Sequence, residues 1–290
     1  MPRRLFASLL LALALFAPAL PEEPPNTDIV LFEVSQTDGS FKLSNPKLIA
    51  KSPGYDNQPF FSEDSQSVYF TRIEDGNADL WLWSPDSGEE NLTSSGWSEY
   101  SPTIVPNTQG LISTVVVEED ETQRLWTYSP YAGFQLLFPL LKPVGYHAWS
   151  GEKVALFVLG EPHELRVGEW GSDETTLADR DIGRCLQTVP GRHAVSYTQV
   201  VNGRHRLAIY DFADASRTSL RLLPPGVQDY VWLNENEVLT WNGTSLVRGR
   251  ADGRDEWRAV SSPMSLKGVS RLAFSPDGKH LAVVYLPNLE

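Results

Sequence analysis

The sequence repeats one short pattern at a nearly constant spacing, and this repeat limits the possible folds more than any other feature. The clearest copy, residues 272–283, reads as a strand, a Pro-Asp-Gly turn and a second strand. Residues 59–70 and 102–114 have the same layout. Weaker copies occupy residues 148–157, 188–197 and 231–241. The chain therefore contains six related hairpins.

The period of the repeat follows from the residue that ends the first strand of each copy. These residues are Ser62, Val105, Ser150, Val189, Leu233 and Ser275. They are separated by 43, 45, 39, 44 and 42 residues. A period of about 40–45 residues is typical of a four-stranded β-propeller blade. Most copies continue with a third strand, as at residues 79–83 and 124–128, and then with a short fourth strand.

The sixth copy ends near Tyr285 after only two strands, and the missing two strands stand at the front of the chain. Residues 28–34 read as a third strand and residues 46–50 as a fourth. Such a closure removes open sheet edges. We therefore predict an all-β fold over residues 28–290: a six-bladed β-propeller of four-stranded antiparallel blades, with the last blade closed by the N- and C-terminal strands. A β-sandwich with fortuitous repeats is the alternative.

The N-terminus has the three-part layout of a secretory signal peptide. Arg3 and Arg4 precede an apolar run at residues 5–16, and the small residues Ala17 and Ala19 follow it. We predict a signal peptide at residues 1–19, a linker at residues 20–27, and a periplasmic or secreted protein with no membrane span after cleavage. An uncleaved N-terminal anchor is the alternative reading.

Charge and cysteine content restrict the partners and the redox chemistry. The formal net charge is −13, and an acidic surface repels phosphate backbones, so we expect no nucleic-acid partner. Cys185 is the single cysteine, so no internal disulfide can form, and we interpret it as a buried hydrophobic side chain. We expect a monomer.

The best-preserved copies resemble a known repeat. Residues 61–64 with Tyr69, residues 79–81 and 92–93, and the Phe-Ser-Pro-Asp-Gly segment at 274–278 resemble the WD40-like (PD40) repeat of TolB and its relatives. The resemblance spans about residues 28–286. It implies a periplasmic adaptor that binds protein partners with its propeller. We expect the TolB N-terminal α/β domain to be lacking, because fewer than ten residues separate Ala19 from the first predicted strand.

Propellers bind ligands where the loops that lead into the innermost strands converge, at the mouth of the central channel. Alignment of the repeats predicts which side chains gather there. The candidate ligand- or partner-binding residues are Tyr55, Asp56, Trp97, Glu99, Tyr100, Tyr146, His147, Arg184, Asp229 and Arg271. Aromatic side chains with a polar rim are good binding anchors, and charged groups orient a ligand. Packing of these side chains within their own turns is the alternative.

Signals for catalysis are weak. Asp56, Asn57, Glu99 and Asp229 could supply oxygen ligands to a divalent cation such as calcium, but Asp and Asn also commonly bind the backbone of their own turns. The sequence contains no short-spaced histidine pair, no Gly-x-Ser-x-Gly and no phosphate-binding glycine loop. We therefore predict a protein- or peptide-binding module of the cell envelope, without catalytic residues, metal ligands or cofactor. A metal-dependent hydrolase or a lactonase-like enzyme that uses the same mouth is the alternative.

Overall fold

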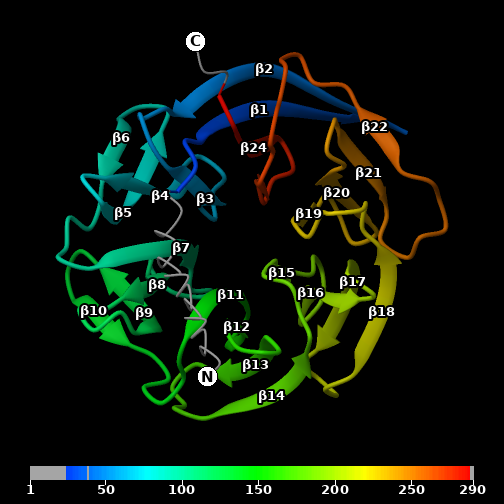
Figure 1. Cartoon of the computed structure of the whole chain (residues 1–290). Coiled ribbons are helices and arrows are strands. Elements are labelled where there is room, and N and C mark those ends of the chain that lie inside the picture. Colours follow the sequence, from blue (N-terminus) through cyan, green and yellow to red (C-terminus); the bar gives the residue numbers. More distant parts are fainter. Residues whose placement is uncertain (1–23, 38, 288–290) are drawn as a thin grey trace, which may run out of the picture.

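The computed structural model describes residues 24–37 and 39–287, and within them 24 strands form six four-stranded sheets. The sheets are antiparallel and are arranged like blades around a common centre (Figure 1). The predicted all-β, six-bladed propeller is therefore confirmed. No helix of the described part is long and apolar enough to cross a membrane. The predicted signal peptide, residues 1–19, lies outside the described residues.

Each blade runs from an innermost strand at the channel to an outermost strand at the rim. Blade 1 contains β3 (Asp56–Phe61), β4 (Val68–Glu74), β5 (Asn77–Ser84) and β6 (Gly88–Asn91). Blade 2 contains β7 (Ser98–Ile104), β8 (Ile112–Val117), β9 (Gln123–Ser129) and β10 (Gly133–Leu136). Blade 3 contains β11 (Val144–Ser150), β12 (Lys153–Val158), β13 (Glu164–Glu169) and β14 (Thr175–Arg180).

The remaining blades follow in chain order until the ring closes. Blade 4 contains β15 (Gln187–Thr188), β16 (Ala194–Val201), β17 (Arg204–Asp211) and β18 (Arg217–Leu222). Blade 5 contains β19 (Tyr230–Trp232), β20 (Glu237–Trp241), β21 (Leu246–Arg250) and β22 (Arg258–Val260). Blade 6 contains β23 (Arg271–Phe274), β24 (His280–Tyr285), β1 (Asp28–Thr37) and β2 (Ser40–Ala50).

Blade 6 joins the two ends of the chain, as predicted. Strand β1 pairs antiparallel with β24 from Asp28 opposite Tyr285 to Glu33 opposite His280. In Figure 1 the blue N-terminal strands accordingly lie beside the red C-terminal strand. Thr27 then links the closing blade to blade 1, because its backbone N–H donates to Gly54 O and its carbonyl accepts from the N–H of Asp56. The ring is thereby closed by backbone pairing.

The hydrophobic core is divided among the blade interfaces. Six clusters of buried side chains lie one between each pair of neighbouring blades. The cluster between blades 5 and 6 is the largest, whereas that between blades 1 and 2 has only Leu80, Ile104 and Ile112 as fully buried members. Strands such as β8 and β12 are buried on both faces because both faces pack against a neighbouring blade.

Two buried serines hold polar groups between blades. Ser196 Oγ on β16 accepts hydrogen bonds from Tyr230 Oη and Trp232 Nε1 of the next blade, both at 2.7 Å. Ser113 Oγ on β8 accepts from Trp149 Nε1 at 2.8 Å in the equivalent place of blades 2 and 3. Burying an indole or phenol donor requires such a partner. These contacts fix the register of one blade against the next.

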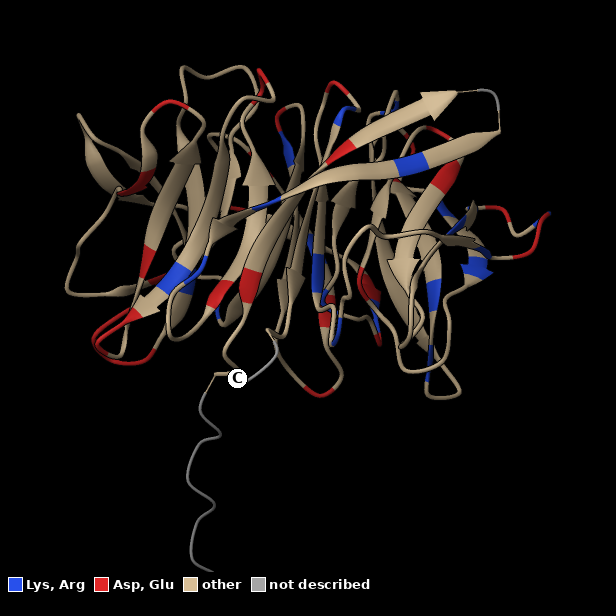
Figure 2. Cartoon of the chain, turned by 90° about the horizontal axis from the view of Figure 1, so that it is seen from above, with Lys and Arg blue, Asp and Glu red and all other residues tan. Residues whose placement is uncertain are grey.

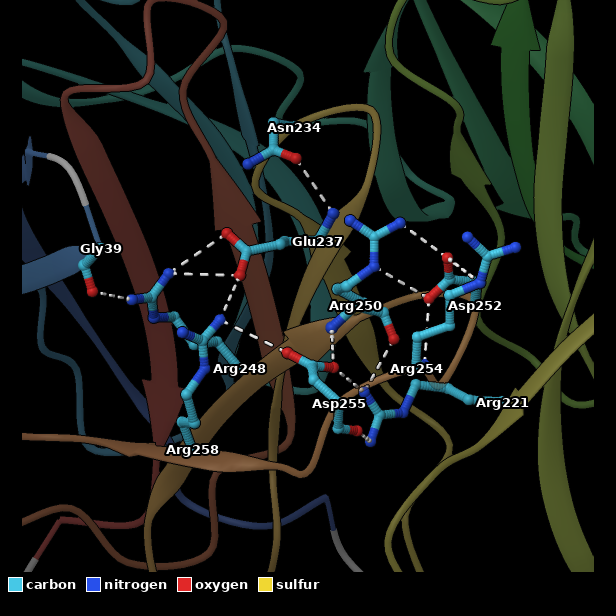
Figure 3. A network of polar contacts seen from close by, with 10 residues as sticks. All are labelled: Gly39, Arg221, Asn234, Glu237, Arg248, Arg250, Asp252, Arg254, Asp255 and Arg258. Atoms are coloured by element: carbon cyan, nitrogen blue, oxygen red, sulfur yellow. Dashed lines mark hydrogen bonds and ion pairs between the residues drawn. The ribbon is translucent and has the colours of Figure 1, made fainter.

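Arginines connect the outer strands of blades 4, 5 and 6 (Figure 3). Arg248 and Arg258 both bond to Glu237, and Arg248 Nη2 also donates to Gly39 O in the β1–β2 turn at 2.7 Å. Arg221 of β18 donates to Arg250 O in β21 at 2.7 Å. This network lies near the rim, with Arg258 exposed and with Arg221 and Arg248 largely buried. Seen perpendicular to the channel, acidic residues occur on loops of both faces of the disc (Figure 2).

Candidate binding site

A channel of about 800 Å³ runs through the centre of the propeller, lined by the innermost strands and their loops. Its apolar lining includes Phe60, Trp149, Leu233 and Phe274. Polar side chains line both ends, and we call the end where the innermost strands begin, with Arg184, Asp229 and Arg271, the mouth. Ligand pockets in proteins commonly have volumes of about 300–1,000 Å³, so the channel is large enough for a small molecule or a short segment of chain.

Six side chains, one from each blade, surround the mouth, and we call them the mouth ring. In order from blade 1 to blade 6 they are Tyr55, Tyr100, Tyr146, Arg184, Asp229 and Arg271. The last four line the channel. Tyr55 and Tyr100 are close to Tyr146 but do not line the channel themselves. One half of the ring therefore carries phenols, and the other half carries charges.

The charged half of the ring is an alternating cluster. Asp229 Oδ1 bonds to Arg271 Nη1 at 2.8 Å, and Asp229 Oδ2 bonds to Arg184 Nη2 at 2.9 Å. The Arg271 side chain is 15% exposed and that of Arg184 is 36% exposed. One carboxylate thus bridges two guanidinium groups from different blades, and the cluster keeps one uncompensated positive charge.

Among the residues that the structure describes, a single side-chain contact crosses the channel. Arg271 Nη2 donates a hydrogen bond to Tyr146 Oη at 2.9 Å, and the guanidinium carbon lies 5.2 Å from the centre of the phenol ring. Tyr146 belongs to blade 3 and Arg271 to blade 6, which stand opposite each other in a ring of six. We call this contact the crossbar. It obstructs the mouth, so a ligand that enters the channel has to displace or pass it.

A smaller cavity of about 280 Å³ adjoins the mouth. It shares Arg184, Asp229 and Arg271 with the channel and extends over the loops that lead into β19 and β23. Two buried donors at this cavity, Arg184 Nε and Ser270 Oγ, have no hydrogen-bond partner in the described part of the chain. The charged half of the ring therefore has cavity space on both sides and unsatisfied donors beside it.

Backbone irregularities shape the mouth. The pairing of β3 with β4 shifts by one residue between Asn57 and Phe60, and the pairing of β7 with β8 shifts between Tyr100 and Thr103. Gln58 and Ser101 sit in these bulges with positive φ, and Gln58 Oε1 accepts a hydrogen bond from Ser101 N–H at 2.8 Å. A bulge changes the direction of the side chains next to it. Here the residues in the two bulges, Gln58 and Ser101, line the channel.

His147 lines the channel and also holds two blades together. Its Nε2 forms a hydrogen bond of 2.7 Å with Ser113 Oγ on β8 of the neighbouring blade. Burial lowers the pKa of His147 to about 3, which keeps it neutral. Cys185 also lines the channel, and burial raises the pKa of its thiol to about 12. Both side chains shape the wall without adding charge.

Asp56 and Glu99 do not reach the channel lining. Asp56 is fully buried and bonds to Arg72 Nε at 2.6 Å and to Ser52 N–H at 2.7 Å. Glu99 is fully buried between blades 1 and 2 and accepts hydrogen bonds from the hydroxyls of Ser95 and Thr93. The predicted placement of these two carboxylates at the mouth surface needs correction, because strand pairing and blade packing turn them inward.

Trp97 also lies away from the predicted place. Its ring packs against Trp126 of β9 and Phe134 of β10, with ring centres 5.3 and 5.8 Å apart. It therefore covers the outer strands of blade 2 rather than the channel. Sequence reasoning also left out Gln58 and Ser101 as site residues; the only signal for them is their alignment with Asp229 and Arg271 in the repeat.

The predicted oxygen ligands for a cation are separated. Asp56 pairs with Arg72, Asp229 pairs with two arginines, and Glu99 is held by hydroxyls. Within residues 24–37 and 39–287, no group of three or more His, Cys, Asp or Glu residues could hold a metal ion. The mouth is best described as a polar ring around an arginine–carboxylate cluster.

No protein-family model and no curated protein matches the sequence. A TolB-type protein from Agrobacterium tumefaciens is 13% identical, with a TM-score of 0.68 over 91% of this chain and 99% of that chain. TolB from Acinetobacter baumannii is 12% identical, with a TM-score of 0.60 over 90% of this chain and 65% of that chain. A gluconolactonase from Xanthomonas campestris is 12% identical, with a TM-score of 0.63 over 94% and 99%. The comparisons show that the fold is that of TolB-like six-bladed β-propellers.

Proposed function

We propose that this protein is an exported binding module of the cell envelope, periplasmic or secreted, whose channel mouth holds a segment of a protein or peptide partner. The main support is the mouth ring: four of its side chains, Tyr146, Arg184, Asp229 and Arg271, come from four different blades and line a channel of about 800 Å³. Phenols provide apolar contact area and hydrogen bonds, and the charged cluster provides orientation.

The channel walls favour a narrow ligand over a broad docking surface. Apolar side chains such as Phe60, Trp149 and Leu233 lie deeper in the channel than the charged ring. A ligand that passes the ring can therefore bury apolar groups while its polar groups stay near the mouth. An extended peptide or a loop of a partner has this shape. The likeness of fold to TolB from Acinetobacter baumannii is consistent with a role in binding proteins.

We propose no second function. The likeness to a gluconolactonase concerns the fold, at 12% identity. The carboxylates that an enzyme of the metal-dependent type was predicted to use, Asp56, Glu99 and Asp229, are each held by separate partners. No observation on the described residues therefore favours catalysis over binding.

Obstruction of the channel tests the proposal. Gln187 lines the channel from β15, and its side chain makes only a long contact of 4.0 Å with Cys185 Sγ. Gln187→Trp should fill the channel, whereas Ser219→Trp on the exposed strand β18 is the matched control. The wild type and Ser219→Trp should capture the same proteins from an envelope extract. Gln187→Trp should not capture them, although its melting temperature equals that of the other two proteins. Equal recovery with all three variants would exclude the channel as the binding site.

A further inference from the structure

We propose that the mouth ring recognises a carboxylate group, which binds to the Arg184–Asp229–Arg271 cluster and replaces the crossbar. This inference rests on the proposed function and specifies the chemistry of the bound segment. The carboxylate is either the C-terminus of a peptide or an Asp or Glu side chain within it.

The charge of the cluster supports an anionic ligand. Two guanidinium groups face one carboxylate, so one positive charge remains in a protein whose formal net charge is −13. The two arginines are held at a cavity, where water is limited and each ionic hydrogen bond is stronger than in bulk water. A cationic ligand would meet this excess charge directly.

The donors of the cluster are only partly used. Arg184 donates to Asp229 through Nη2, while its buried Nε has no partner in the described part of the chain. Arg271 uses Nη1 for Asp229 and Ser270 O, and Nη2 for Tyr146. A carboxylate accepts two parallel N–H donors from one guanidinium, and the free edge of Arg184 offers this arrangement.

A phenol completes the site from the opposite side. Tyr146 Oη already accepts from Arg271, so its own hydrogen remains free to be donated. Tyr55 and Tyr100 do not line the channel, and burial raises the pKa of both phenols, so they add no negative charge near the site. A carboxylate placed between Arg271 and Tyr146 would meet guanidinium donors on one side and the Tyr146 hydroxyl on the other.

The single excess charge favours a carboxylate over a phosphate. A phosphate monoester carries about −1.5 to −2 charges at neutral pH, and Asp229 would repel the part that the cluster does not neutralise. The arginine network at the rim offers no comparable site. There Arg248, Arg258 and Arg221 bond to carboxylates and carbonyl oxygens (Figure 3). Arg221 Nε has no partner in the described part of the chain either, but none of the three arginines lines either cavity.

The test uses four pools of hexapeptides with identical lengths, selected on the immobilised protein and counted by mass spectrometry. The first has neutral side chains and a free C-terminal carboxylate, and the second is amidated with one Asp or Glu. The third is amidated and neutral, and the fourth is amidated with one Lys. We expect enrichment of the first or the second pool over the third by about tenfold. Which of the two is enriched identifies the source of the carboxylate.

Two variants move the affinity in opposite directions. Arg271→Gln should lower binding of the enriched pool about tenfold, because a charged donor is lost. Asp229→Asn should strengthen binding, because it removes the internal carboxylate that competes for the two arginines. A gain cannot result from misfolding. Arg217→Gln is the matched control and should change nothing, because Arg217 is an exposed residue of β18 that pairs with Asp179 of β14, away from the channel.

The outcomes separate this inference from the proposed function. If the neutral pool binds as well as the acidic ones and Gln187→Trp abolishes all binding, the channel binds peptides but the carboxylate inference is wrong. If Asp229→Asn weakens binding as Arg271→Gln does, the inference is wrong too. If no pool binds, or if Gln187→Trp changes nothing, the proposed function and the inference both fail.

Discussion

Glu99 provides a quantitative test of how the blades pack. It is fully buried at the interface of blades 1 and 2, near Asp79, which adds a second negative charge. Burial raises the pKa of Glu99 from 4.5 to about 7, although hydrogen bonds from Ser95 and Thr93 act in the opposite direction. Glu99 is therefore neutral in the folded protein at pH values where it is ionised in the unfolded chain.

The sign and size of the effect follow from linkage. Because the pKa is higher in the folded state, the contribution to stability is complete below pH 4.5 and is lost as the pH rises through about 7. At about 1.4 kcal/mol for each pH unit, the loss amounts to about 3 kcal/mol, most of it between pH 5 and 8. Glu99→Gln keeps the shape and removes the charge. The difference in the free energy of unfolding, Glu99→Gln minus wild type, should therefore increase by about 3 kcal/mol as the pH rises, most of it between pH 5 and 8.

Urea unfolding at pH 5, 6, 7 and 8 measures the difference between the two proteins. Glu118→Gln is the control, because a hydrogen bond from Arg124 lowers the pKa of Glu118. That carboxyl is ionised in both states above about pH 6, so its substitution should shift the stability by a constant amount from pH 6 to 8. If the difference between the wild type and Glu99→Gln is also constant across the whole range, Glu99 ionises at the same pH in the folded and the unfolded protein, and the reasoning is refuted.

Two further substitutions test the packing between blades. Ser196→Ala leaves the buried donors of Tyr230 and Trp232 without their acceptor and should cost about 2–4 kcal/mol in urea unfolding; a loss below about 0.5 kcal/mol would contradict this account. In Gly183→Ala the new Cβ would overlap Thr198 Oγ1 and lie 2.8 Å from His205 Nδ1. We expect the free energy of unfolding to fall by about 1–3 kcal/mol. Gly96→Ala is the control and should not change it, because the added Cβ contacts no other atom. Equal stability of the two variants would show that the structure around Gly183 relaxes.

The fold was predictable because the information for it is local and repeated. Each hairpin needs its own turn residues and its own apolar strands, and this pattern occurs six times in the sequence. The residues used to measure the period directly follow an innermost strand, as Ser62 follows β3, or end one, as Ser150 ends β11. The closure was also predictable, because residues 28–50 supply the two strands that the last hairpin lacks.

The side chains of the site were less predictable, because their partners come from other strands and their register is irregular. Without the bulge at Gln58, counting back from the β3–β4 turn would set Asn57 opposite Arg72. The bulge sets Asp56 there instead, where it forms a buried ion pair. The crossbar joins residues 125 positions apart in opposite blades. No local pattern in a single sequence encodes such a contact.

The contrast between the blade interfaces and the mouth bears on function. The interfaces keep apolar side chains in equivalent places all around the ring, because every blade has to pack against its neighbours. The mouth ring lies on the same repeated backbone but carries phenols on three successive blades and charges on the other three. A ring of identical side chains would offer a ligand six equivalent orientations. The divided ring offers one, since a group that binds Arg184 and Arg271 must turn its other side toward the tyrosines.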